Sequence, residues 1–593
     1  MLLIAFLYML AISWRKWSDL IVDYGQQLYV PWLLSEGQVL YRDIHYIYGP
    51  LSSYLHALLF KIFGPGIIVL AWFNIVLIAG LAWILYLVLK DITDELTATA
   101  GTLTFITVFA FAQYVGGGNF NFVGAYVYEL PHGIFLSFLA IQQFAKYARN
   151  PEPRRLAILG FLCGLIYLTK PEVFLAAFTA LVMGLAMVHR WANPQQPFKK
   201  LLVFASFFLI PSLGFLVYFS LHTSVGTGLE TLISPWVHIM NSELRSLPLY
   251  QWMLGTRDFG SNLIQAVIYF FFISGLLVLI FLVNRVFKSF IESQRLATGL
   301  FGLLLTGLIL LLSGQIHLLS LGRPLPVILF IFAGYLFYKI FNDSQAKTPR
   351  PEIWVETVLT VFSFLLLLKI LFNTHIYHYG FALALPATLI TVKIFLYDFP
   401  RWGRHFGANL SFCRSLSLIL VLIFISVHFK LNSNIYQLKG LSVGTQRDRI
   451  VDYHSFLDSR GLIFNAALDY IDQNFDKGIE FATLPDTIMV NYLSRHKSST
   501  EYIILNPGVW LLVGNEAVID SLKRSSPLYI LLVDREYPEF GLKIFGKDFG
   551  AGILDWVMKN YLLEKQFGKT PFTGQGFGIQ ILKQKETQEY VNE

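Results

Sequence analysis

Charged residues are scarce in this chain of 593 residues. They make up 14% of the sequence, whereas soluble globular domains carry about 25%. The hydrophobic fraction is 55% and the mean hydropathy is +0.57. Many apolar runs are long enough to cross a hydrocarbon core of about 30 Å, where only helices satisfy every backbone amide within one segment. The composition therefore excludes a soluble protein and predicts a polytopic α-helical membrane protein.

Cysteine is almost absent as well. Cys163 lies inside an apolar run and Cys413 in a basic loop, so the sequence offers neither a disulfide framework nor a cysteine metal cluster. It also contains no phosphate-binding glycine loop, nucleophile elbow or HExxH motif. These absences argue against ATP-driven transport and intramembrane metalloproteolysis.

About thirteen apolar stretches are predicted to be membrane helices. They lie at roughly 1–16, 65–89, 96–115, 132–148, 155–169, 172–189, 201–221, 262–284, 296–313, 324–341, 353–372, 379–397 and 414–430. The first stretch lacks the basic start and small-residue exit of a cleaved signal peptide. We therefore expect it to be a membrane segment.

Lysine and arginine distinguish the two sides of the predicted membrane domain. The loops at 146–155 and 401–414 are basic, whereas alternate loops such as 373–380 contain neither residue. Because basic loops remain in the cytoplasm, the N-terminus is predicted to be cytoplasmic, in a bacterial-type inner (plasma) membrane. The first long loop, 17–64, is then outside. Much of the net charge of +7 lies in short loops, so we expect no nucleic-acid partner.

Residues 431–593 differ in character from the preceding sequence. Charges are frequent there, and apolar runs at 526–534 and 576–583 are typical of strands. The stretch at 553–565 has a helical pattern. Such alternation favours a small α/β domain. We predict a membrane domain at 1–430 and an extracytoplasmic α/β domain at 431–593.

The first outer loop contains the segment 22–50, VDYGQQLYVPWLLSEGQVLYRDIHYIYGP, with two acids in aromatic surroundings. Apolar and aromatic residues recur every four positions within 24–36, which favours an interfacial helix interrupted by Pro31. Asp23 lies just before this helix and Asp43 just after it. Either Asp23 caps the helix and Asp43 is solvated, or the loop is a reaction site.

Two further segments place charged residues at predicted helix ends. Glu129 and His132 lie at a membrane boundary, where an acid requires either a partner or a function; an interfacial turn is the alternative. Lys170 and Glu172 flank Pro171 inside an apolar run. They are suited to bind an anionic headgroup, or they pair with each other at a helix hairpin.

Arg323, His375, His378 and Tyr379 lie at outer helix ends. Arginine binds phosphate oxygens in a bidentate manner, which suggests a phosphate site. His375 and His378 alone are a weak metal signal, because interfacial histidines at this spacing are common.

The order of these elements resembles the GT-C superfamily of polyprenyl-phosphate-sugar-dependent glycosyltransferases. The similarity is to family 39 protein mannosyltransferases and aminoarabinose transferases. Asp23 matches the acid of their first outer loop, Asp43-Ile44-His45 matches a second element, and Gly49-Pro50-Leu51 replaces Pro-Pro-Leu. Glu129 falls where many members have a second-loop acid. The resemblance covers the order of elements along nearly the whole chain.

One position departs from the family pattern. Asp23 is followed by Tyr24, whereas the family typically has Asp-Glu there. Asp19 is therefore a rival for the role of the catalytic acid.

The resemblance implies an inverting transfer of a hexosyl or pentosyl group from a polyprenyl-phosphate carrier to a glycan, lipid or protein acceptor at the outer face of the bilayer. Such a displacement needs a base and positive charge for the leaving phosphate. The residues assigned are Asp23 as base with Asp43 and Glu129 in support, then Lys170, Arg323, His378 and Tyr379 for the donor phosphate, and His45, His132 and Glu172 for the acceptor or other contacts. No cofactor is certain, and a divalent metal remains open.

Two other functions use the same kind of carrier. A transporter or flippase for a lipid-linked sugar predicts paired halves of similar hydropathy, and this sequence lacks such pairing. An outer-leaflet polymerase or ligase typically relies on a large middle loop, whereas the loop at 222–262 is moderate in length.

Overall fold

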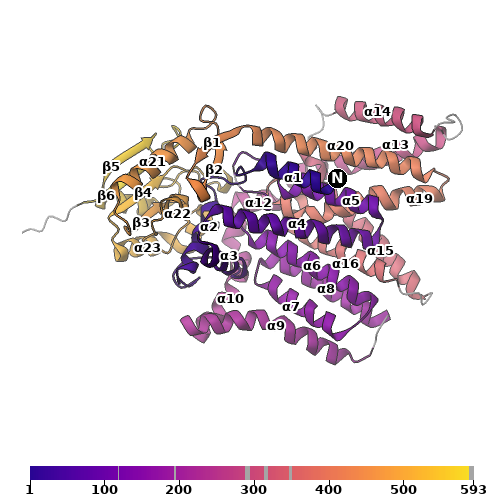
Figure 1. The fold of residues 1–593 in the computed structure, drawn as a ribbon, viewed down its shortest axis with the longest axis horizontal. Coiled ribbons are helices and arrows are strands. Elements are labelled where there is room, and N and C mark those ends of the chain that lie inside the picture. Colours follow the sequence, from indigo (N-terminus) through magenta and orange to yellow (C-terminus); the bar gives the residue numbers. More distant parts are fainter. Residues whose placement is uncertain (118, 192–194, 288–293, 313–317, 346–349, 586–593) are drawn as a thin grey trace, which may run out of the picture.

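The computed structural model describes residues 1–117, 119–191, 195–287, 294–312, 318–345 and 350–585. A helix bundle forms most of the molecule, and a mixed domain of strands and helices sits at one end of it (Figure 1). Eight helices in the described ranges are long and apolar enough to cross a membrane. These observations confirm the predicted multi-pass helical membrane protein with a small C-terminal α/β domain.

Each predicted span coincides with a helix of the bundle, and residue 313 at the end of one predicted span lies outside the described residues. The helices are α1 (Leu2–Ser13), α4 (Ile67–Ile92), α5 (Glu95–Thr104) with η1 (Phe105–Ala110), α6 (Glu129–Arg149), α7 (Pro153–Tyr167), α8 (Pro171–Trp191), α9 (Pro197–His222), α13 (Phe259–Phe287), α14 (Gln294–Leu312), α15 (Leu325–Gln345), α16 (Pro351–Leu367), α18 (Leu385–Lys393) and α20 (Leu410–Gln437). The number of membrane crossings stays a prediction.

Short helices cover the end of the bundle that carries the C-terminal domain. They are α2 (Tyr24–Ser35), α3 (Leu51–Phe63), α10 (Val225–Met240), α11 (Ser242–Ser246), α12 (Pro248–Leu254), η3 (Leu368–Asn373) and α17 (Gly380–Leu383). Most are too short or too polar to cross the bilayer, so they shape the surface on which the C-terminal domain lies.

Helix α2 differs from the interfacial helix predicted for this stretch. It is continuous through Pro31, and its residues from Tyr24 to Leu34 are buried. The reason is that α22 (Met489–Ser494) of the C-terminal domain packs directly against it. At Gly25, a Cβ atom would lie 2.5 Å from the amide nitrogen of Met489, so this close approach requires glycine. The aromatic side chains of α2 therefore lie in a protein core and not among headgroups.

The C-terminal domain is built on a four-stranded sheet in the order β3-β4-β6-β5. Strands β3 and β4 are parallel, and the remaining pairs are antiparallel. A separate antiparallel pair, β1–β2, follows α20. The bounds are β1 (Lys439–Val443), β2 (Ile450–Tyr453), β3 (Phe481–Leu484), β4 (Tyr529–Val533), β5 (Tyr561–Gly568) and β6 (Gly578–Gln584).

Helices cover both faces of this sheet. Side chains alternate between the two faces along a strand, so Leu531 of β4 packs with α21 (Arg460–Asn474), while Ile530 packs with α23 (Pro507–Ser525) and α24 (Ala551–Asn560). The core that contains Leu531 also contains buried residues of α2 and α3. The C-terminal domain and the first long loop therefore share one hydrophobic core.

The two predicted strands are present as β4 and β6, but the helical pattern at 553–565 is partly wrong. Helix α24 ends at Asn560, and Tyr561 begins β5. The strand is favoured because its backbone pairs with β6, with Leu563 opposite Leu582. Long-range pairing overrides the local helical periodicity here.

Candidate functional site

Asp23 occupies the N-cap position of α2 but does not act as a cap. Its φ is 56°, in the left-handed region, and its side chain makes no capping hydrogen bond. A residue other than glycine in this region costs roughly 1–3 kcal/mol. The carboxylate instead lines a cavity of about 580 Å³. The backbone is thus held in a strained conformation that presents an acid to a cavity.

This space, named here the Asp23 cavity, lies between the bundle and the C-terminal domain. One wall comes from the first loop, the segment before α6, α12 and the turn before α17. The other wall comes from the C-terminal domain, which had shown no chemical signal in the sequence. Its polar lining includes Asp23, Tyr48, Tyr126, Tyr250, His378, Tyr379, Arg460, Asn506, Asp534, Arg535, Glu536 and Glu539.

The pKa of Asp23 is raised to about 7. Burial is the largest cause, because it disfavours the charged form. Asp486, Asp19 and Glu539 raise the pKa further, while Arg535 opposes them. A carboxyl group with this pKa is partly ionised at neutral pH, which suits a general base.

Arg535 is the cation that faces Asp23 from the C-terminal domain. It forms an ion pair with the buried Asp486, and its Nη2 lies 3.7 Å from Glu539 Oε1. Its guanidinium also stacks at 4.5 Å from the ring centroid of Tyr537. Nothing in the local sequence marks Arg535, because its place at the cavity depends on the docking of the whole domain.

Asp19, the rival acid, is engaged by the protein itself. Its Oδ1 accepts hydrogen bonds from the amides of Ile21 (2.8 Å) and Val22 (3.0 Å), and its Oδ2 lies 3.6 Å from Arg460 Nη1. Burial acts to raise the pKa of Asp19, but Arg460 and the two amides outweigh it and hold the pKa below its usual value. Asp19 is therefore a poorer base than Asp23.

A second cavity of about 480 Å³, named here the Lys170 cavity, adjoins the first. Four tyrosines line both cavities and form the partition between them: Tyr48, Tyr126, Tyr250 and Tyr379. The charged residues of the Lys170 cavity are Lys170, Glu172, Arg245 and Lys369, and His238 also lines it. Apolar side chains of α8 and α16 form the rest, including Leu175, Ala176, Leu365 and Leu366.

Glu172 holds two lysines in this cavity. Lys369 Nζ lies 2.5 Å from Glu172 Oε1, and Lys170 Nζ lies 3.6 Å from the same oxygen. Lys170 Nζ also donates a hydrogen bond to the Tyr126 hydroxyl at 2.6 Å. The sequence predicted Lys170 and Glu172 but missed Lys369, which lies on η3, far along the chain. The predicted pairing of Lys170 with Glu172 is present, and a second cation joins it.

The Gly-Pro pair at 49–50 brings the first loop to this hairpin. The amide of Gly49 donates to Thr169 O at 3.1 Å, and that of Leu51 donates to Leu168 O at 3.2 Å. A Cβ atom on Gly49 would collide with these carbonyl groups. The contact places Tyr48 beside Lys170, with 5.3 Å between Lys170 Nζ and the ring centroid.

His378 and Tyr379 are also brought to the site. His378 lines the Asp23 cavity, with its ring centroid 4.0 Å from that of Phe120. Tyr379 lines both cavities, and its ring centroid lies 5.5 Å from Lys369 Nζ.

Asp43 and His45 line neither cavity. Asp43 pairs with Arg42 at 2.7 Å and accepts a hydrogen bond from the amide of Val39 at 2.7 Å. Its side chain is 29% exposed. The ring of His45 packs against Tyr502, with 5.7 Å between centroids. The structure thus supports the solvated reading of Asp43 over its expected role beside Asp23.

Glu129 and His132 are buried in the bundle, outside both cavities. Glu129 Oε1 accepts a hydrogen bond from the Tyr46 hydroxyl at 2.7 Å. His132 is held between Ser52 Oγ (2.9 Å) and Asn74 Oδ1 (3.1 Å). Hydrogen bonds within the bundle thus engage both ring nitrogens of His132 and one oxygen of Glu129, and the other oxygen, Oε2, is buried with no hydrogen-bond partner among the described residues.

Arg323 also lies apart from the cavities. Its guanidinium donates to Asn262 Oδ1 at 2.6 Å and to Phe372 O at 3.4 Å. It therefore ties α13 to η3, the element that carries Lys369, and the structure does not bring it to the expected phosphate site.

The described residues do not fit a metal ion. In the ranges given above, no group of three or more His, Cys, Asp or Glu side chains is placed to hold one. The rings of His375 and His378 are 6.4 Å apart, and His375 Nδ1 bonds to the carbonyl of Asn373. No step proposed below therefore involves a metal.

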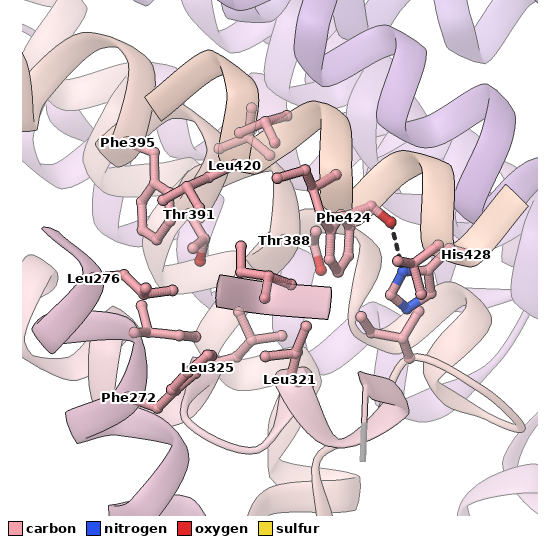
Figure 2. Close-up of a pocket in the computed structure, with 18 residues that line it drawn as sticks. Phe272, Leu276, Leu321, Leu325, Thr388, Thr391, Phe395, Leu420, Phe424 and His428 are labelled. Atoms are coloured by element: carbon pink, nitrogen blue, oxygen red, sulfur yellow. Dashed lines mark hydrogen bonds between the residues drawn. The ribbon is translucent and has the colours of Figure 1, made fainter. Parts of the chain in front are cut away.

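A third pocket, of about 120 Å³, lies among α13, α15, α18 and α20 (Figure 2). Apolar side chains such as Phe272, Leu325 and Leu420 surround it, and the Nδ1 atom of His428 bonds to Phe424 O at 2.9 Å. None of the residues that line it also lines the Asp23 or Lys170 cavity. Among the described residues, no Asp, Glu, Lys or Arg side chain lines it.

Comparison with known proteins gives a family match over part of the chain and similarities in fold to solved structures. Residues 48–215 match the family described as dolichyl-phosphate-mannose-protein mannosyltransferase. The chain is similar in structure to ArnT from Cupriavidus metallidurans bound to undecaprenyl phosphate, with a TM-score of 0.50 at 11% identity, covering 98% of this chain and 96% of that one. The Archaeoglobus fulgidus oligosaccharyltransferase in complex with Zn and sulfate has a TM-score of 0.48 at 12% identity, covering 90% and 67%.

No curated protein matches the sequence. The family match and the shared fold confirm the predicted resemblance to GT-C glycosyltransferases.

Proposed function

We propose that this GT-C-type membrane protein transfers a sugar from a polyprenyl-phosphate carrier to an acceptor hydroxyl, at the outer face of the membrane and with inversion at the anomeric carbon. One observation carries the proposal: a cavity with a base and a cavity with paired lysines meet at the same four tyrosines. An inverting displacement needs a base on one side of the reacting carbon and positive charge on the other.

In the proposed reaction, the acceptor enters the Asp23 cavity. As its hydroxyl oxygen bonds to the anomeric carbon, the proton passes to the Asp23 carboxylate. The bond from the anomeric carbon to the phosphate oxygen breaks, and its electron pair leaves with the lipid phosphate. The raised pKa of Asp23, about 7, matches this role because a base works best when its pKa is close to the working pH.

The leaving phosphate is assigned to the Lys170 cavity. Three cations and one carboxylate line it, a formal net charge of +2 that suits a dianionic phosphate. Glu172 fixes Lys170 and Lys369 before the donor binds, so little reorganisation is needed as charge develops. The lipid chain is assigned to the apolar walls of α8 and α16.

The match to a mannosyltransferase family over residues 48–215 supports glycosyl transfer. The structural neighbour ArnT was solved with undecaprenyl phosphate, which supports a lipid carrier of that kind. The outer-face assignment rests on the distribution of Lys and Arg among the loops. A flippase gives an acid with a raised pKa at a cavity no evident role.

The test uses the full chain in lipid nanodiscs with polyprenyl-phosphate sugars and a membrane extract as the source of acceptor. We expect release of polyprenyl phosphate that depends on the acceptor, and a product with the anomeric configuration opposite to that of the donor, as read by NMR. Retention of configuration would contradict the single displacement. Absence of release with every donor tried would contradict the proposed function.

A further inference from the structure

The Asp23 cavity has an excess of negative charge. Four carboxylates line it, Asp23, Asp534, Glu536 and Glu539, against two guanidinium groups, Arg460 and Arg535. The adjoining Lys170 cavity has the opposite excess, since three cations line it against Glu172. Two neighbouring spaces of opposite charge imply that the two substrates differ in charge.

The two arginines are already neutralised by acids behind the cavity wall. Arg460 Nε lies 2.6 Å from Asp458 Oδ2, and its Nη1 lies 3.6 Å from Asp19 Oδ2. Arg535 pairs with the buried Asp486. Their charge is therefore balanced within the protein, and little of it is left to attract an anion into the cavity.

The negative charge of the cavity carboxylates is less fully neutralised by neighbouring cations. Glu536 pairs with Lys543 at 3.0 Å at the rim, and both side chains are partly exposed. Asp534 Oδ1 accepts the amide of Phe572 at 2.6 Å, a neutral partner. Among the described residues, the only ion pair of Glu539 is with Arg535, at 3.7 Å, and Arg535 already pairs with Asp486.

Counted together, seven carboxylates of the lining and its supporting layer face three cations. The formal charge is −4 when Asp23 is ionised. Lys439 and Asp452, which lie behind Arg460, offset each other in this count. The pKa of Asp23 responds to the same field, because three acids raise it and one arginine lowers it.

Aromatic rings complete the lining. Tyr48, Tyr126, Tyr250 and Tyr379 line the cavity together with the acids. Carboxylates and tyrosine faces together bind ammonium groups well, by charge and by cation–π attraction. One of these rings already accommodates a cation, since Lys170 Nζ lies 4.8 Å from the Tyr126 ring centroid. The arrangement favours a protonated amine and disfavours phosphate or carboxylate groups.

We infer that the acceptor is a hydroxyl compound that carries a protonated amine, such as a sugar with a free amino group. Asp534, Glu536 and Glu539 attract the amine, and the acceptor hydroxyl then lies against Asp23. This inference rests on the proposed function and adds the chemical class of the acceptor. It also predicts that acceptors with anionic groups near the reacting hydroxyl are rejected.

The test compares three octyl glycosides that differ in charge: the glucosaminide with a free amine, its N-acetyl counterpart, and the anionic glucuronide. Each is offered to the full chain in nanodiscs with the same donor. We expect kcat/KM for the amine to exceed that for the N-acetyl compound about tenfold at low salt, with the glucuronide lowest. In 0.5 M NaCl the advantage should shrink, because salt screens the field.

Binding to the donor-free protein is measured in parallel, so that a glycoside that binds without being turned over is still informative. The expected order of affinity is the same. Equal affinity for all three, a preference for the glucuronide, or no binding of the amine overturns the inference.

Variants that remove one carboxylate from the cavity test which residues cause the preference for the amine. Glu539→Gln and Glu536→Gln should each reduce the ratio of amine to N-acetyl turnover several-fold. Asp520→Asn is the matched control, because Asp520 is 68% exposed and pairs only with Lys523 at 3.4 Å among its described contacts. Unchanged ratios in both cavity variants contradict the assignment.

Failure of the two proposals can be told apart. If the protein releases lipid phosphate with membrane extract but rejects amines, only the acceptor class is wrong. If no acceptor, extract included, gives release, the proposed function itself fails.

Discussion

The Asp23 and Lys170 cavities share four tyrosines but differ in almost everything else. The Lys170 cavity is built by the bundle and its short helices, and Glu172 pairs with two of its three cations, Lys170 and Lys369. The Asp23 cavity needs the C-terminal domain for one wall, and its central acid stands in a strained backbone conformation. The proposed binding region therefore has lysines already held in position, whereas the proposed base stands on a strained backbone.

The difference follows from what each cavity is proposed to do. A site for a phosphate gains from cations that are already held in position. A base gains from burial, because burial brings the carboxyl pKa toward neutrality. Substitutions in the Asp23 cavity and substitutions in the Lys170 cavity should therefore impair the reaction in different ways.

The largest effect is expected at Asp23. Asp23→Asn removes the proton acceptor, so transfer to the acceptor should fall about 10³-fold, within the range expected for general bases. Asp43→Asn is the matched control in the same loop, and it should remain within about twofold of wild type because Asp43 lines neither cavity. Release of radiolabelled polyprenyl phosphate measures both. Equal losses in the two variants would restore Asp43 to the site.

The next effect is expected in the Lys170 cavity. Lys170→Met and Lys369→Met each remove a cation from the leaving phosphate, and kcat should fall about 10²-fold, as when one transition-state donor is removed. Lys90→Met is the control, because Lys90 pairs with Glu95 at the surface. This variant should leave turnover unchanged. A loss confined to acceptor KM in the cavity variants would contradict the phosphate assignment.

A smaller effect concerns pH. Asp23 must be ionised to accept a proton, so the rate should rise with pH through about 7, the pKa of Asp23. Arg535 lowers that pKa, and Arg535→Gln should move the rising limb upward by about one pH unit.

Arg524→Gln is the control for this shift, because Arg524 is 72% exposed and pairs with Glu501 at 2.9 Å. Initial rates from pH 5.5 to 9 give the two profiles. An unshifted limb in Arg535→Gln would show that Arg535 does not act on the base.

The smallest effect concerns stability. Because the folded state raises the pKa of Asp23 to about 7 from an unfolded value of about 3.9, the stability of the wild type falls as pH rises through this interval. The Asp23→Asn variant has no carboxyl group at this position, so it does not lose stability in this way as the pH rises. Its advantage in unfolding free energy should grow by roughly 1–2 kcal/mol between pH 5 and pH 8, after a discount for solvent screening.

Thermal unfolding followed by tryptophan fluorescence at both pH values tests this. A constant difference between variant and wild type would mean that Asp23 is already ionised at pH 5. The combination of lost activity and raised stability would identify a residue kept for chemistry at a structural cost.

The elements of the fold were largely predictable, and the errors are local. Each apolar run predicted to be a span coincides with a helix of the bundle, because the bilayer requires helices. The stretch at 553–565 was misassigned, since pairing of β5 with β6 is a long-range contact. Helix α2 was placed at the interface because its aromatic pattern does not reveal that α22 covers it.

The sequence predicted only those site residues that lie within one loop or one helix hairpin. Asp23, Lys170 and Glu172 interrupt apolar surroundings, and burying a charge there needs a reason. Lys369 also interrupts an apolar run, LLLLKILF, so the same signal was present there. Arg535 and the acids around it carry no such mark, because their neighbours in the sequence are themselves polar. Arg323 and Glu129 have the right charge at a helix end, yet nearby partners engage them.

The sequence by itself determined the membrane-spanning class, the C-terminal α/β domain and the resemblance to GT-C transferases, because composition and the order of elements are properties of the chain. Only the tertiary structure decided which acids share a cavity, that Asp23 and not Asp19 is unengaged, and that two cavities of opposite charge meet at four tyrosines. The physical reason is that electrostatic environment depends on distance in space, and the groups that set it at Asp23 come from both ends of the chain.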